Sequence, residues 1–259
     1  MLKGILYFLV IILANTIGSV SGMGGGVIIK PVLDFFALDS VAAVSFYSTV
    51  AVFVMSIVST IRQVQNGIAL EYLKIVWLSI GSVLGGILGN TSFEMLLTQF
   101  NSDTVQFVQI FLTIVTLVFA FLYTRFEWRN FNLQSYVWYL FTGIVLGFIA
   151  SLLGIGGGPI NVSLLMLLFA MPIKSATVYS IATILFSQLA KILTVGFTTG
   201  FLRYDLTMLW YIIPAAIIGG LLGDKVSRLL SPKKVTFVFQ GVILLVLLVN
   251  IYNGIQIIR

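Results

Sequence analysis

A glycine-rich pentapeptide occurs twice in the chain, as GMGGG over 22–26 and as GIGGG over 154–158, so that the copies start 132 residues apart. A glycine run allows positive φ and lets the backbone approach an anion closely, and a helix that begins behind it supplies free amides and about half a positive charge. The pattern predicts two main-chain anion sites, and Pro159 fits the first position of a helix. The predicted ligands are Gly24, Gly25, Gly26, Gly156, Gly157 and Gly158.

Each glycine run follows an apolar run and precedes an apolar piece that is too short to cross a bilayer. Backbone groups freed at membrane depth are tolerated only where protein or a cavity satisfies them. Broken helices in matching halves of a chain therefore indicate a transport site. The alternative is that the glycines only let helices approach each other closely.

Polar side chains near the glycine runs could complete such a site. Hydroxyl and amide hydrogens of Ser and Asn could bind the same anion, and two tyrosines could add phenolic donors or form a gate. The alternatives are hydrogen bonds to neighbouring backbone or between helices for Ser and Asn, and ordinary aromatic contacts for Tyr. These candidates are Ser21, Ser48, Asn161, Ser180, Tyr47 and Tyr179.

Lys191 is a cation inside a predicted span, which makes it a functional candidate. It also lies about 9 Å from the predicted helix end, so it could instead extend to the outer interface. Gln188, one turn earlier, is expected on the same face. Lys30 and Lys174 lie near segment ends and are interpreted as interfacial anchors or attractors of anions.

Asp34 and Asp39 are expected near the external surface. Either could take part in proton coupling, but solvation at the surface is the favoured interpretation.

The composition excludes a soluble globular domain, because 59% of residues are hydrophobic and only 8% are charged. The absence of Cys and His removes disulfides, thiolate ligands and the commonest metal ligand and catalytic base. We therefore expect no metal, no cofactor and no enzyme activity. The net charge of +6 comes from short loops and is interpreted as a topology signal, so no nucleic-acid partner is expected.

The hydropathy pattern predicts one all-α membrane domain over 1–259, with about eight long transmembrane helices and two short half-helices or re-entrant segments. A cleaved signal peptide is the alternative for the first segment, but residues 12–22 align with 144–154 inside the chain, and the segment is interpreted as structural. The expected long spans are 4–21, 41–62, 72–90, 105–124, 136–153, 174–197, 206–223 and 235–257, and the short pieces are 27–37 and 159–170.

An internal duplication extends beyond the glycine runs. Tyr47-Ser48 corresponds to Tyr179-Ser180 at the same offset, and GGILG over 85–89 corresponds to GGLLG over 219–223. The predicted repeats are 1–130 and 131–259. Five segments per half is an odd number, so the halves are expected to enter the membrane from opposite sides, as inverted repeats.

Lys and Arg in the short loops predict the orientation. Loops 125–134 and 224–234 are basic and are expected in the cytoplasm, whereas 91–104 carries only Glu94 and Asp103 and is expected outside. Both termini are then external, although Lys3 and Arg259 fit this orientation poorly.

At its two glycine runs the chain resembles the TauE/SafE sulfite exporter family of membrane anion transporters, also called TSUP. The segment 154–161 and the alanine-serine segment 175–180 match the family pattern more closely than do Met23, Lys30 and 43–48 in the first half. The resemblance covers essentially the whole chain. It implies movement of sulfur oxyanions or small sulfonates across the cytoplasmic membrane, usually as export, without selecting among sulfite, thiosulfate, sulfoacetate or a related carboxylate.

Three other classes of protein are compatible with a chain of this composition to different degrees. An intramembrane aspartyl protease would need Asp205 and Asp224 about 3 Å apart, but the sequence places them at opposite ends of one span, roughly 28 Å apart. A scaffold would need larger soluble segments. A passive anion channel, or an uptake permease for a related carboxylate or sulfonate, stays open. The expected partners are a small anionic substrate and the lipid bilayer, with a homo-oligomer left open.

Overall fold

The computed structural model describes residues 2–66, 71–126 and 128–258, and over these ranges its regular structure is helical. The first half contains α1 (Leu2–Ser21), α2 (Gly26–Phe36), α3 (Val41–Gln65), α4 (Tyr72–Gln99) and α5 (Ser102–Phe126). The second half contains α6 (Tyr136–Leu153), α7 (Pro159–Phe169), α8 (Ile173–Phe197), the 3-10 helix η1 (Leu206–Met208), α9 (Leu209–Leu229) and α10 (Pro232–Ile258).

Eight helices of the described part are long and apolar enough to cross a membrane, with η1 and α9 counted as one span. The helices α2 and α7 have 11 residues each, about 17 Å, which is roughly half of the hydrocarbon core. The predicted all-α membrane fold with eight long and two short helices is confirmed.

Several helices are longer than the spans that the sequence predicts. The helix α4 continues to Gln99 instead of ending near 90, and α9 continues to Leu229 instead of 223. The predicted loops 91–104 and 224–234 are therefore mostly helical. Hydropathy marks only the segment inside the hydrocarbon, whereas a helix continues into the interface while its residues favour helical structure.

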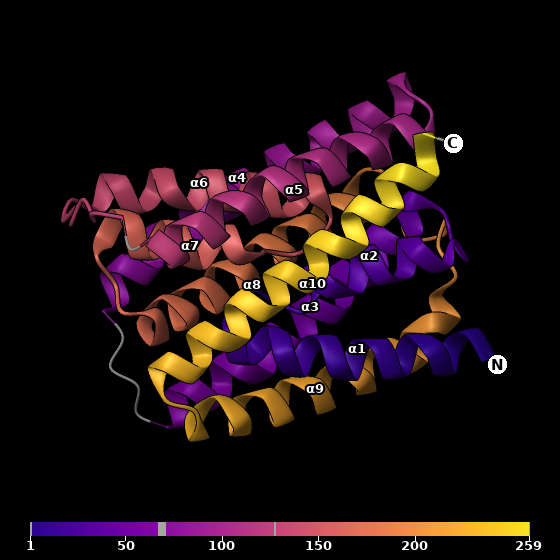
Figure 1. The fold of residues 1–259 in the computed structure, drawn as a ribbon. Coiled ribbons are helices and arrows are strands. Elements are labelled where there is room, and N and C mark those ends of the chain that lie inside the picture. The colour runs from indigo at the N-terminus through magenta and orange to yellow at the C-terminus, as the bar shows by residue number, and fades with distance from the viewer. Residues whose placement is uncertain (1, 67–70, 127, 259) are drawn as a thin grey trace.

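The centre of the molecule is formed by α3 and α8, which are the most buried of the long helices. Figure 1 shows α1 and α9 together along one edge of the bundle and α4 and α6 along the other, with α3 and α8 between them. Because α3 and α8 contact each other, and α3 packs on α1 and α9 while α8 packs on α4 and α6, side chains from their middle turns face the interior of the protein.

Glycines explain the tight contact of the outer helix pairs. A Cβ on Gly143 of α6 would clash with the backbone of Leu78 in α4, and a Cβ on Gly223 of α9 would lie 2.6 Å from the carbonyl oxygen of Thr16 in α1. Here the close-packing role of glycine holds. The glycines of the two pentapeptides differ, because they lie at the helix breaks between α1 and α2 and between α6 and α7.

The two chain ends lie at the same face of the bundle (Figure 1). At this face Lys3 of α1 pairs with Asp39, which precedes α3, at 2.7 Å. Arg203, which precedes η1, pairs with Glu94 near the end of α4 at 2.5 Å. We call this face the termini face.

The opposite face carries most of the Lys and Arg residues, and we call it the basic face. Arg228 near the end of α9 donates to Asn66 after α3 at 3.1 Å, and Lys74 of α4 lies 5.8 Å from the ring of Tyr139 in α6. The helix ends gathered at this face carry Arg62, Lys74, Arg125, Arg129, Lys174, Lys225, Arg228, Lys233 and Lys234.

The first half begins at the termini face and ends with α5 at the basic face, whereas the second half begins with α6 at the basic face and ends at the termini face (Figure 1). In addition, α1 contacts α9 as α6 contacts α4. This arrangement supports the inverted repeat, which stays a prediction.

Candidate functional site

The two glycine breaks lie against each other in the interior. A Cβ on Gly26 would collide with the carbonyl oxygen of Ile155, and a Cβ on Gly157 would lie 3.1 Å from the carbonyl oxygen of Met23. All five residues of each pentapeptide are buried. The structure thus brings together backbone segments that are 132 residues apart in the sequence.

Two apolar side chains locate the glycine breaks along the bundle. Val52 and Ile184 are each the twelfth residue of a 25-residue helix, α3 and α8 respectively. Their side chains reach the place where a Cβ on Gly24 would stand, at 3.4 Å for Val52 and 3.2 Å for Ile184. Since the middle of a spanning helix lies near the middle of the bilayer, the glycine breaks lie deep in the protein.

Backbone geometry explains why these positions are glycine. Gly156 has a φ of +67°, where an L-residue with a Cβ is strained, and a Cβ there would also lie 2.9 Å from Cγ1 of Val52. Gly26 has no such φ, but its missing side chain allows the close approach of the second glycine run. Gly25 and Gly26 do not have a positive φ, so close approach alone requires glycine at these two positions.

Both short helices begin at the glycine breaks, as the sequence predicts. The helix α2 begins at Gly26 behind Gly25, α7 begins at Pro159 behind Gly158, and neither start has a side-chain cap. The amides of a helix start have no partner inside the helix and carry the positive end of its dipole. Two such ends therefore meet at the glycine breaks.

Three of the candidate side chains are fully buried and have polar atoms without a hydrogen-bond partner within the described residues. These atoms are Oγ of Ser48, both amide atoms of Asn161, and Oε1 of Gln188. Ser48 is placed at the first break, with its Oγ 2.9 Å from the Cβ position of Gly26. Asn161 lies in the first turn of α7. Buried polar atoms nearly always have partners, so such a group calls for an explanation.

Other candidates make structural hydrogen bonds. Ser180 Oγ donates to the carbonyl oxygen of Gly22 at 2.6 Å and fixes the first break, while Ser21 Oγ donates to its own helix at Ile17. Tyr47 and Tyr179 occupy equivalent positions near the starts of α3 and α8. The hydroxyl of Tyr47 donates to the backbone oxygen of Asp205, and that of Tyr179 accepts from the amide of Glu71. The tyrosines thus lie toward the two faces, away from the breaks.

Lys191 is buried, and its side chain does not extend to the interface. Its ammonium donates to Ser45 Oγ at 2.8 Å and to the carbonyl oxygen of Ser151 at 2.9 Å, and it lies 5.1 Å from the ring of Phe93. Ser45 Oγ fills the place that a Cβ of Gly154 would take. Lys191 forms none of the ion pairs found between described residues. Its amino group therefore lies beside the second break.

Two expectations about charged residues are wrong. Asp34 is not solvated at the surface, because its side chain is 5% exposed and pairs with Lys30, which is itself buried instead of anchoring an interface. Asp39 is also engaged, by Lys3 and by the hydroxyl of Tyr7. A hydropathy scale does not reveal such pairs, because it scores each charged residue by itself as polar. It therefore places both residues at the surface even when they neutralise each other inside the protein.

Sequence reasoning missed several residues at the breaks. Val52 and Ile184 are related by the same offset as the glycine runs, so the duplication offered a signal for them. Ser45 and Ser151 hold Lys191, and Asn15 fills the space beside Gly25. Isolated small polar residues in apolar spans give no comparable signal.

Other chemistries find little support in the geometry. No group of three or more metal-ligating side chains occurs in the ranges that the structure describes. Asp205 lies at the termini face before η1, whereas Asp224 lies near the other end of α9 and pairs with Arg228. The two carboxylates thus lie toward opposite ends of one span, which does not suit an aspartyl dyad.

Eight apolar spans around two broken helices and a buried polar centre are the features of a multi-pass membrane transporter. The chain belongs to the sulfite exporter TauE/SafE family, whose model matches residues 7–250. It is also similar to the probable membrane transporter protein YunE of Bacillus subtilis (strain 168), with 26% identity over 269 residues that cover 94% of this chain and 96% of the relative. No solved structure matches the chain at a significant level.

Proposed function

We propose that the protein carries small sulfur-containing anions, such as sulfite, thiosulfate or an organosulfonate, across the cytoplasmic membrane. The observation that supports this most directly is the meeting of two uncapped helix starts at the glycine breaks, beside the buried ammonium of Lys191. The description of the family to which the chain belongs, sulfite exporter TauE/SafE, supports the same class of cargo. Main-chain amides, the hydroxyl of Ser48 and the amide nitrogen of Asn161 would donate hydrogen bonds to the anion.

This set of groups suits transient binding. An anion that leaves water needs several hydrogen bonds and a positive potential in place of its hydration shell. The helix starts supply partial positive charges, and the amino group of Lys191 adds a further donor beside them. A carrier needs this balance because it must release its cargo.

The orientation follows from the basic face, which we place in the cytoplasm by the positive-inside rule. With the cytoplasm negative, outward movement of a divalent anion releases about 4.6 kcal/mol per 100 mV, twice the value for one charge. Facilitated export then needs no coupling ion, whereas uptake of the same anion would need cotransported cations. We propose export as the direction.

We test the function by flux of 35S-labelled sulfite, thiosulfate and a small sulfonate through proteoliposomes with a set membrane potential. Gly156→Leu should abolish flux, because its backbone conformation and Val52 both oppose a side chain. The matched control is Gly241→Leu, since Gly241 lies in α10 with open space around its Cβ position. Equal flux for both variants, with both folded, would refute the site.

A channel is the remaining alternative. The apolar side chains of Val52 and Ile184 against the glycine breaks are consistent with a closed site that must open to either side in turn. Saturable flux with counterflow would identify a carrier, and flux far above the rate of conformational cycling would identify a channel.

A further inference from the structure

A buried ion pair lies between the glycine breaks and the termini face. Lys30 Nζ and Asp34 Oδ2, one turn apart on α2, are 2.7 Å apart, and their side chains are 4% and 5% exposed. Burying two charges carries a desolvation cost that their mutual attraction only partly offsets. The stability of the helix bundle therefore does not explain this pair. Its position between two cavities suggests a role in binding instead.

The surroundings of this pair are polar although they lie inside the protein. Gln109 and Thr113 of α5 and Asn250 of α10 are all buried, and Oε1 of Gln109 has no hydrogen-bond partner in the described part of the chain. Together with Lys30 and Asp34 they line a small cavity of about 10 Å³, room for about one water. Ile155, from the second glycine run, lines the same cavity.

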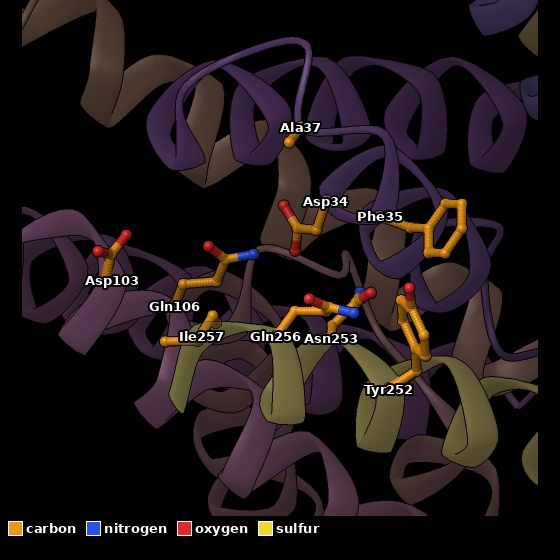
Figure 2. Close-up of a pocket in the computed structure, with 9 residues that line it drawn as sticks. All are labelled: Asp34, Phe35, Ala37, Asp103, Gln106, Tyr252, Asn253, Gln256 and Ile257. Atoms are coloured by element: carbon orange, nitrogen blue, oxygen red, sulfur yellow. The ribbon is translucent and has the colours of Figure 1, made fainter. Parts of the chain in front are cut away.

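A larger cavity of about 460 Å³ adjoins the pair on the outer side. It is lined by the ends of α2, α5 and α10, all of which reach the termini face. Figure 2 shows the carboxyl group of Asp34 and the amides of Gln106 and Gln256 directed toward the same space, which Asp103 also lines. The amide nitrogen of Asn253 donates to the carbonyl oxygen of Pro31 at 2.8 Å. Asp34 lines both cavities, so the pair separates the outer space from the cavity that touches the second break.

We propose that the outer cavity is the vestibule of the anion route and that Lys30, which lines the small cavity at its inner end, is an anion-binding subsite behind Asp34. While no anion is present, the carboxylate of Asp34 binds the ammonium of Lys30. An arriving anion replaces this carboxylate at the ammonium, and the carboxylate turns toward the amides of the vestibule. This inference rests on the proposed function, because it assumes that the cargo of the glycine breaks is an anion.

Single substitutions of Asp34 and of Lys30 should then change the KM in opposite directions. Asp34→Asn removes the internal competitor and should lower the KM for labelled thiosulfate in proteoliposomes. Lys30→Met removes the subsite and should raise the KM by roughly 10- to 100-fold, the effect of one charge-assisted hydrogen bond. Loss of flux in folded Asp34→Asn would overturn the proposal.

A double variant separates binding from structure. Lys30→Met with Asp34→Leu removes both charges and leaves none unpaired, a change that buried pairs often tolerate. Its thermal midpoint in detergent should equal or exceed that of the parent, while thiosulfate flux falls by roughly tenfold or more. The matched control is Lys74→Met with Glu71→Leu, a pair 2.6 Å apart near the basic face, which should keep its flux. Parental flux in the Lys30 and Asp34 double variant would refute the subsite.

The vestibule itself can be tested without any cargo. The chain has no cysteine, so each single-cysteine variant carries one thiol. In nanodiscs, an anionic, membrane-impermeant methanethiosulfonate should label Gln106→Cys, whose side chain lines the outer cavity. It should not label Phe111→Cys, because Phe111 lies on the side of the same helix that faces away from the protein, toward lipid. Absence of labelling at Gln106→Cys would refute the vestibule even if the protein transports sulfur anions. Labelling without any anion flux would instead refute the proposed function alone.

Discussion

Replacement of Asn161 by leucine should change stability and transport in opposite directions. Both amide atoms of Asn161 are buried and lack hydrogen-bond partners among the described residues. Leucine has the same number of side-chain heavy atoms and a similar branched shape. A residue that serves only the fold would not be left in this state, because an unpaired buried polar group costs about 1–3 kcal/mol.

The expected magnitudes follow from these atoms. Removing the unpaired amide should raise the free energy of unfolding by about 1–3 kcal/mol. If the amide donates to the bound anion, its loss should cost about 1.5–3 kcal/mol of binding, which raises the KM by roughly 10- to 100-fold. A more stable protein with weaker binding is the signature of a ligand-binding group.

Thermal unfolding in detergent and the concentration dependence of thiosulfate flux measure the two quantities. Thr60→Val is the matched control, since Thr60 Oγ1 is also buried without a partner in the described residues and lies eight residues beyond Val52, about 12 Å along α3. This control should gain stability and keep its KM. An unchanged KM for folded Asn161→Leu would show that the amide does not bind cargo.

Three further changes test neighbouring parts of the site. Lys191→Met should raise the KM by about 100-fold, because two unit charges attract by about 3 kcal/mol at an assumed separation of about 6 Å and an effective dielectric constant of about 20; an unchanged KM would exclude Lys191 from the site. Gly156→Ala should destabilise the protein by about 1–2 kcal/mol through its positive φ. Adding Val52→Ala should recover only the share of this loss that comes from the steric contact with Val52, and a double-mutant cycle of thermal unfolding would measure that share. Ser180→Ala should lower the free energy of unfolding by about 1–3 kcal/mol, since it leaves the carbonyl oxygen of Gly22 without this donor, and a raised KM at unchanged stability would make Ser180 a ligand instead.

Much of the fold could be predicted from the sequence, because a bilayer imposes simple rules. Spanning helices need about 20 apolar residues, so their number and approximate positions follow from hydropathy. The helix breaks at Gly24 and Gly156 follow from local backbone preference, as does the start of α7 at Pro159. These features depend on residues that are adjacent in the chain.

The site could be predicted only in part, because its details depend on contacts between distant segments. The sequence gives no means of telling that Ser180 donates to Gly22, whereas the hydroxyl of Ser48 has no partner among the described residues. The pairing of Lys30 with Asp34 was within reach, since they are one helical turn apart. Their burial was not, because it is created by α5 and α10.

The most direct test of the central claim is the position of a bound anion. Selenite is a close analogue of sulfite, and selenium gives an anomalous signal in diffraction from crystals grown with it. We expect an anomalous peak between the two glycine breaks, where the oxygens around the selenium can accept hydrogen bonds from the backbone amides at the starts of α2 and α7. A peak found elsewhere, with none at the breaks, would contradict the claim that the main chain of both glycine runs holds the cargo.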